Sequence, residues 1–361
     1  MMDCKTKLYK TKILAEQNLY KSVISINKTL EEEEKHKEKE YLTFGVKNTV
    51  DIPIEVVDKL RKNSKYLFTT VDKMSHIGRS VDTDLINPLT YRCMTGSSSG
   101  TAVNILKGIN DFGIGTDGGG SVLAPALSTN LYSFIGSGIG LVTGKEGLST
   151  DSISFNGGIG IISKDLPVLK MVVEDIIHKE INYKQKKTRV LIPAYNCLKL
   201  PDGIDMRLEI DKTISNINKE EFEFKEYFFE NIYERSIGIK EIKYIFENDM
   251  ADIILTYEGP IDVYGYDETI QRSFKGKAEK EITSNGGKAI VKAANMCKCT
   301  ALTIPGDKLA SGFVICAKEG MDGLVNAFKL GETLDNNIEK NEVFNRYFIE
   351  REKFIEPIKI N

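Results

Sequence analysis

The spacing of apolar residues divides the chain into short buried runs and amphipathic stretches. Between residues 10 and 40, apolar side chains recur near helical spacing, with lysine and glutamate between them. This pattern predicts an N-terminal helical segment over residues 1–40, whose charged end at 31–40 faces solvent. A short strand is expected directly afterwards, at 41–50.

Further along, apolar runs alternate with clusters of glycine and serine. Runs of this kind suit buried strands, which we expect at 66–68, 112–114, 159–162, 189–192, 253–255, 301–304 and 312–317. Helical spacing predicts helices at 102–109, 168–177, 288–296 and 321–330. The stretch 212–247 is charged and aromatic, without a clear motif. The alternation of both element types predicts an α/β fold with mixed layers in one large domain.

Composition and charge narrow the kind of partner. Hydrophobic residues make up 41% and charged residues 28%, which is the balance of a chain with a packed core. The 49 basic and 52 acidic residues give a net charge of −3, so no strong field favours nucleic acid or an anionic membrane. No apolar run reaches the roughly 18 residues of a membrane span. These features predict a soluble protein that binds a small molecule or another protein.

The cysteines and histidines do not indicate a metal site. Six cysteines are scattered through a chain that opens without an apolar signal region, which favours a reducing, cytoplasmic setting. Cys297 and Cys299 lack the two-residue spacing and the second ligand pair of a zinc site. The three histidines lie far from them in sequence. We therefore expect no metal, and cysteines that serve packing.

Two glycine- and serine-rich clusters, at residues 95–101 and 115–121, are the candidates for chemistry. Ser97 in the first and Ser121 in the second are 24 positions apart. Residues 113–118 match a Gly-x-Gly-x-x-Gly pattern, but the acidic residue that a dinucleotide site needs about 20 positions later is missing. No Gly-Lys-Ser/Thr closes a phosphate loop, and His36, His76 and His178 lie in no nucleophile–base motif. No cofactor is expected.

A serine nucleophile without a histidine needs another proton acceptor, and a neutral lysine can serve. Lys47 lies within an apolar strand pattern, in the sequence Phe-Gly-Val-Lys-Asn-Thr-Val. Burial disfavours the ammonium form and lowers the pKa of a lysine, so a buried Lys47 could act as a base near neutral pH.

Together these residues resemble the amidase signature family. The segments 46–50, 95–100 and 115–125 follow one another as the family's lysine strand, serine loop and nucleophile loop do. Residues 252–256 and 294–305 are similar to its later motifs. The resemblance implies a central mixed β-sheet flanked by helices on both faces. It places the amidase signature domain at 41–361, with core motifs at 41–165 and 251–330 and a variable substrate region at about 170–290.

The resemblance also implies roles for individual residues. Ser121 is the expected nucleophile, and Lys47 is the expected base. Ser97, held by a cis peptide bond after Gly96, is expected to relay the proton between them. The expected oxyanion hole consists of the backbone amides of Gly118, Gly119, Gly120 and Ser121. Ser98, Asp117 and Thr116 are the expected supporting residues.

Four positions depart from the family pattern. Leu123 replaces the arginine after the nucleophile, and Asn48 replaces the acidic neighbour of the lysine. Thr95 and Ser99 replace glycines of the first loop. These changes predict a divergent branch in which Asp117 lacks its usual charge partner.

Three functions fit this pattern. The first is hydrolysis of a small carboxamide, or of an amide in a metabolite or peptide, through an acyl-enzyme. The second is a glutaminase-type amidotransferase subunit, and the third is a non-catalytic binding protein on the amidase fold. Neither nucleic acid nor membrane is an expected partner, and a homodimer or an amidotransferase-like partner stays open.

Overall fold

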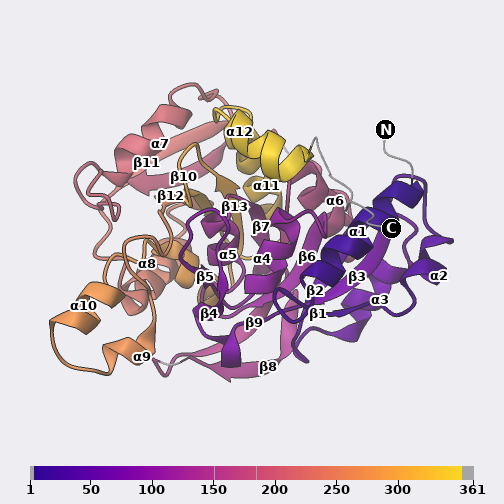
Figure 1. Ribbon diagram of the computed structural model, residues 1–361. Helices are drawn as coiled ribbons and strands as arrows, with labels where there is room; N and C mark the ends of the chain where they lie inside the picture. The colour runs from indigo at the N-terminus through magenta and orange to yellow at the C-terminus, as the bar shows by residue number, and fades with distance from the viewer. Residues whose placement is uncertain (1–3, 150, 184, 352–361) are drawn as a thin grey trace.

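A large mixed β-sheet runs through the middle of the molecule (Figure 1). The computed structural model describes residues 4–149, 151–183 and 185–351. The sheet has twelve strands, in the order β1-β3-β2-β6-β9-β7-β13-β14-β12-β10-β11, with β8 paired to β9. A second sheet contains only β4 and β5. The strands are β1 (Val23–Ile26), β2 (Leu42–Lys47), β3 (Tyr66–Asp72), β4 (Val81–Ile86), β5 (Cys93–Thr95), β6 (Phe112–Asp117), β7 (Tyr132–Ile135), β8 (Val142–Leu148), β9 (Ser154–Ser163), β10 (Thr188–Pro193), β11 (Phe222–Tyr227), β12 (Ile253–Glu258), β13 (Thr300–Pro305) and β14 (Gly312–Ala317).

Helices cover both faces of the large sheet (Figure 1). The α-helices are α1 (Cys4–Gln17), α2 (Leu30–Glu34), α3 (Ile54–Lys62), α4 (Ser99–Leu106), α5 (Leu123–Ser128), α6 (Leu166–Ile177), α7 (Met206–Ile214), α8 (Arg235–Glu247), α9 (Thr269–Arg272), α10 (Lys277–Thr283), α11 (Met321–Asp335) and α12 (Glu342–Phe344). Short turns of 3-10 helix are η1 (His76–Gly78), η2 (Ser137–Ile139), η3 (Ile290–Lys292) and η4 (Asn295–Cys297), and a π-helical turn is η5 (Asn345–Glu350).

Two groups of helices form the layers. In the first, the ammonium of Lys59 in α3 donates to the carbonyl of Ile176 in α6, and Lys170 of α6 pairs with Glu332 of α11. The second group contains α4, which packs on β2 and β6, and α5, which packs on β7 and β13. The expected α/β fold, a mixed sheet flanked by helices, is confirmed.

The middle of the sheet brings the site residues together. β2 is parallel to β6, with Val46 opposite Ile114. The carboxyl ends of parallel neighbours lie at one edge of a sheet, so Lys47 at the end of β2 lies beside Thr116 and Asp117 at the end of β6. The stacked rings of Phe44 and Phe112, with centroids 5.3 Å apart, fix the same two strands in the core.

The single helix predicted between residues 10 and 40 is wrong. The helix α1 ends at Gln17, and β1 then pairs antiparallel with β3 before α2 begins at Leu30. Val23, Ile24 and Ile26 are β-branched residues that suit an edge strand, and Val23 is fully buried there. Apolar spacing alone did not distinguish a helix from a strand here, because the strand is short and the turns around it are polar.

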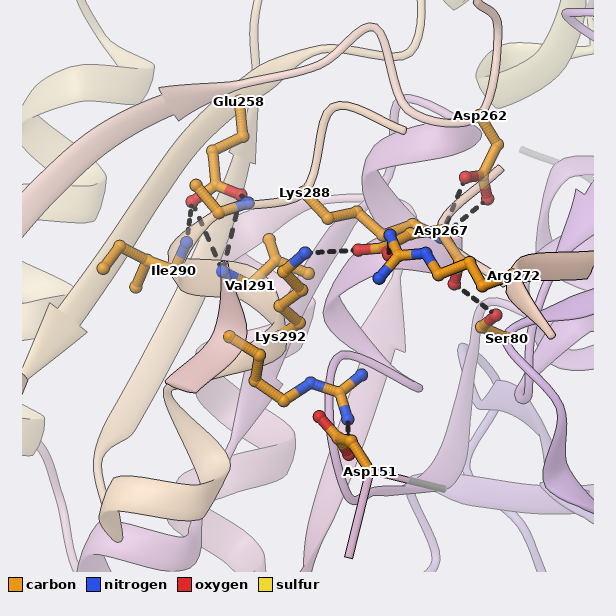
Figure 2. A network of polar contacts seen from close by, with 12 residues as sticks. Ser80, Asp151, Glu258, Asp262, Asp267, Arg272, Lys288, Ile290, Val291 and Lys292 are labelled. Atoms are coloured by element: carbon orange, nitrogen blue, oxygen red, sulfur yellow. Dashed lines mark hydrogen bonds and ion pairs between the residues drawn. The ribbon is translucent and has the colours of Figure 1, made fainter. Parts of the chain in front are cut away.

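The helix predicted at 288–296 is also wrong, because this segment forms only the turns η3 and η4. The buried carboxylate of Glu258 accepts hydrogen bonds from the amides of Ala289, Ile290 and Val291 (Figure 2). This carboxylate, which lies at the end of β12, therefore holds the start of the segment in a tight turn. Among the described residues, no helix is long and apolar enough to cross a membrane.

Candidate active site

A cavity of about 590 Å³ opens at the carboxyl ends of β2 and β6. Both loops that the sequence singled out line it, so Lys47, Ser97 and Ser121 share one space. Three exposed aliphatic side chains, Ile77, Leu148 and Ile270, also line it. Its size suits a small molecule.

Lys47 and Ser97 are in direct contact. The Nζ atom of Lys47 donates to Ser97 Oγ at 2.7 Å, to Thr116 Oγ1 at 3.0 Å and to the Thr116 carbonyl at 3.1 Å. Lys47 is 2% exposed and Ser97 3% exposed. The peptide bond between Gly96 and Ser97 is cis, as expected. The expected base, the relay serine and the supporting Thr116 therefore form one cluster, in which Lys47 and Ser97 are buried and Thr116 is half-buried.

Burial changes the ionisation of this lysine. Desolvation lowers the pKa of Lys47 to about 8, against the opposing effect of the carboxylates of Asp117 and Asp51. A neutral amine at the end of β2 is thus accessible near physiological pH, which an exposed lysine would not provide.

Asp117 organises the loop that carries Ser121. Its Oδ1 atom accepts from the Gly120 amide at 2.7 Å, and its Oδ2 atom accepts from the amides of Val122 at 2.6 Å and Leu123 at 3.2 Å. Burial raises the pKa of Asp117, and these backbone hydrogen bonds oppose that rise. Backbone amides on both sides of Ser121 thus hold a carboxylate that has no arginine beside it in the sequence.

The same contacts set the Gly120 amide apart from the other three amides of the expected oxyanion hole. The amide of Gly120 is engaged by Asp117 and is not aimed at the substrate space. Within the described part of the chain, the amides of Gly118, Gly119 and Ser121 make no hydrogen bond to the protein. Gly120 instead provides the turn, with a φ of 99° that favours glycine. Three of the four expected amides are therefore free to bind a developing negative charge.

Ser98 supports the site through its backbone. Its amide donates to the Ser121 carbonyl at 3.1 Å, which ties the two loops together. Its hydroxyl is buried and has no hydrogen-bond partner among the described residues. A side chain larger than hydrogen at Gly115 would meet this hydroxyl, since an added Cβ would lie 2.6 Å from Ser98 Oγ.

Two departures from the family pattern make specific contacts. The Thr95 hydroxyl donates to Asp262 at 2.6 Å, and the Ser99 hydroxyl donates to Asp82 at 2.6 Å. All four side chains are buried. These hydroxyls anchor the first serine loop at both ends, where glycines could not.

Sequence reasoning missed Asn295. Its side-chain amide donates to the carbonyls of Gly118, at 3.1 Å, and Asn156, at 3.0 Å. Asn295 thereby fixes the start of the nucleophile loop from a segment 177 residues away. Its place in the 294–305 segment, which resembles a family motif, was the available signal.

The described cysteines do not form a metal site. Cys93, Cys197, Cys297, Cys299 and Cys316 are free, and the side chain of Cys4 lies outside the described residues. Over residues 4–149, 151–183 and 185–351, no three histidine, cysteine or acidic side chains are grouped so that they could hold a metal ion.

Comparisons with known proteins find sequence similarity to amidases in one part of the chain. Residues 84–190, which contain both serine loops, match the sequence model of the family described as Amidase. Amidase 1 of Oryza sativa subsp. japonica is 31% identical over 123 residues, which cover 34% of this chain and 26% of that protein. Amidase 1 of Arabidopsis thaliana is 35% identical over 115 residues, which cover 32% of this chain and 26% of that protein. The matched stretch thus spans about a quarter of each relative.

Solved structures match over nearly the whole chain. A crystal structure of an amidase superposes with a TM-score of 0.63 at 17% identity, covering 92% of this chain and 96% of that one. The substrate complex of 6-aminohexanoate cyclic dimer hydrolase gives 0.66 at 11% identity, covering 93% and 94%. The allophanate hydrolase of Kluyveromyces lactis gives 0.60 at 13% identity, covering 93% and 70%.

The fold is therefore that of the amidase signature proteins, an α/β architecture in which a glycine-rich loop presents a serine at the sheet edge. Within that fold, residues 84–190 carry the sequence similarity to the Amidase family and to the two plant amidases.

Proposed function

We propose that this protein hydrolyses an amide through a Lys-Ser-Ser relay, with Ser121 as the nucleophile. The contact between Lys47 Nζ and Ser97 Oγ, at 2.7 Å in the cavity that Ser121 also lines, is the observation that carries the proposal. The lowered pKa of Lys47 supports it, because only the neutral amine accepts a proton.

In the first step Ser121 Oγ attacks the carbonyl carbon of the amide. Its proton passes to Ser97 Oγ as Ser97 gives its own proton to neutral Lys47. The carbonyl oxygen becomes an oxyanion, which the amides of Gly118, Gly119 and Ser121 would stabilise. Lys47 is then an ammonium, held by Thr116.

Collapse of the tetrahedral intermediate breaks the carbon–nitrogen bond. The proton on Lys47 returns through Ser97 to the leaving nitrogen, which departs as ammonia or an amine. Water then attacks the acyl group on Ser121 along the same relay and releases the carboxylic acid. The protein returns to neutral Lys47 and two protonated serines, so protons and bonds balance over the cycle.

The volume of the cavity, about 590 Å³, supports a small carboxamide or a small metabolite or peptide amide as substrate. The described residues bring the lysine, both serines and the free amides together within one chain. We therefore infer that the chemistry needs no partner subunit and no nucleic acid.

The test is release of ammonia or amine by the purified chain from glutamine, asparagine, aliphatic and aryl amides, and short peptide amides. We expect turnover of at least one amide, and its loss in Ser121→Ala. If glutamine is hydrolysed only after a copurifying partner is added, the amidotransferase alternative replaces this proposal. If no amide is hydrolysed with or without partners, the binding-protein alternative does.

A further inference from the structure

An arginine from the variable region borders the nucleophile loop. Arg235, the first residue of α8, lines the cavity, and a Cβ added at Gly119 would lie 3.4 Å from its Cζ atom. Its side chain is 18% exposed. The guanidinium therefore lies close to Gly119 in the nucleophile loop.

This guanidinium keeps donors that the protein does not use. Its Nη1 atom donates to Asp151 at 2.8 Å, whereas its Nε atom is buried and has no partner among the described residues. Nε and Nη2 form the edge of a guanidinium that binds a carboxylate with two parallel hydrogen bonds. A buried unpaired donor is costly, so a turn of the side chain that brings this edge to an acceptor in the cavity would be favourable.

The neighbouring cations are already paired. Lys288 forms an ion pair with Asp262 at 2.8 Å, and Asp267 accepts from both Lys292 and Arg272 (Figure 2). With Arg235 and Asp151 included, these four cations pair with three carboxylates, and Arg79, which also lines the cavity, pairs with Glu268. Asp151 is 38% exposed, so its pairing with Arg235 at the rim is weak. Arg235 is therefore the cation in this group whose partner is most exposed, and it can turn to an acceptor in the cavity.

We propose that Arg235 binds a carboxylate of the substrate, so that the protein acts on short amides that carry a free carboxylate, such as monoamides of small dicarboxylic acids. A single carboxylate suits one guanidinium edge, because Lys288, Lys292 and Arg272 already have carboxylate partners. This inference rests on the proposed function, since it names the substrate class of the same site.

Direct binding tests it without turnover. Ser121→Ala protein is titrated by calorimetry with malonamate, succinamate and glutaramate, and with propionamide, butyramide and pentanamide, which carry a methyl group in place of the carboxylate. Ionic strength is kept constant. At least one carboxylate compound should bind about tenfold or more tightly than its uncharged counterpart. Arg235→Gln in the same background should abolish that difference.

Two further variants sharpen the result. Asp151→Asn removes the negative charge that competes for the guanidinium, and it should tighten carboxylate binding a few-fold. Arg92→Gln also removes one positive charge, from an exposed position outside the cavity, and it should preserve the carboxylate preference. Equal binding of both series, or a preference that persists in Arg235→Gln, would overturn the inference.

Turnover by the unmodified protein separates the two proposals. If the protein hydrolyses neutral amides without preferring those with a carboxylate, the assigned substrate class is wrong, but the proposal of amide hydrolysis is supported. Carboxylate binding that depends on Arg235, without turnover of any amide, confirms the ligand class of the cavity and overturns the hydrolase proposal.

Discussion

The carboxylate of Asp117 accepts a hydrogen bond at 2.7 Å from the amide of Gly120, the residue directly before Ser121. Its second oxygen accepts from the amides of Val122 and Leu123, the two residues that follow Ser121. In sequence, Leu123 in place of arginine predicted an Asp117 without a partner. The structure shows that backbone amides take that role, so the nucleophile loop is held without an arginine.

Asp117→Asn tests this arrangement. An amide side chain of the same shape must turn an N–H donor toward one set of backbone N–H groups, which loosens the loop around Ser121. We expect kcat to fall by about tenfold or more and the free energy of unfolding to fall by about 1–3 kcal/mol. Steady-state kinetics and denaturant unfolding check this. The exposed Asp307→Asn is the matched control, and equal effects of both variants would contradict the role of Asp117.

The ionisation of Lys47 should determine the acid limb of the pH–rate profile. Its pKa is lowered to about 8, and only its neutral form is active as a base. kcat/KM should therefore rise with pH through about 8 and fall as the pH drops below that value. Lys47→Met should remove both the activity and this limb. A profile that is flat between pH 6 and 9 would be inconsistent with a lysine base.

Thr116→Val should move that limb. The hydroxyl accepts from Lys47 Nζ at 3.0 Å and thereby stabilises the ammonium. Its loss lowers the pKa further, so the acid limb should shift toward lower pH, by up to about one unit. Thr143→Val, at a cavity residue without a hydrogen bond to Lys47, should leave the limb in place. A shift in the opposite direction would argue against Thr116 as an acceptor for the ammonium.

Ser99→Ala tests whether the departures from the family pattern stabilise the first loop. The variant removes a buried hydrogen bond of 2.6 Å to Asp82, which keeps its ion pair with Lys73. We expect the free energy of unfolding to fall by about 1–2 kcal/mol. Ser25→Ala, at an exposed position in β1, is the control and should change stability much less. An unchanged unfolding midpoint for Ser99→Ala would rule out a stabilising role.

Predictions from sequence succeeded where the pattern was local. Continuous apolar runs gave the buried strands β3, β6 and β13, because strands buried on both faces have such runs. The two serine loops were recognisable because their chemistry lies within a few consecutive residues. The edge strand β1 was missed, since its four residues also fit helical spacing.

The site contacts that the sequence did not reveal are those between distant segments. Asn295 reaches Gly118 across 177 positions, and Thr95 reaches Asp262 across 167. Arg235 comes from a charged stretch without a motif, and only the packing of α8 places it beside Gly119. Partners of this kind are decided by tertiary structure, so periodicity and local motifs do not reveal them.

The most direct test of the relay is labelling with a fluorophosphonate, followed by peptide mapping of the adduct. The account predicts an adduct on Ser121 in the unmodified protein, none in Ser121→Ala, and much slower labelling in Lys47→Ala and Ser97→Ala. An adduct on Ser97 or another residue, or undiminished labelling of Ser121→Ala, would contradict it.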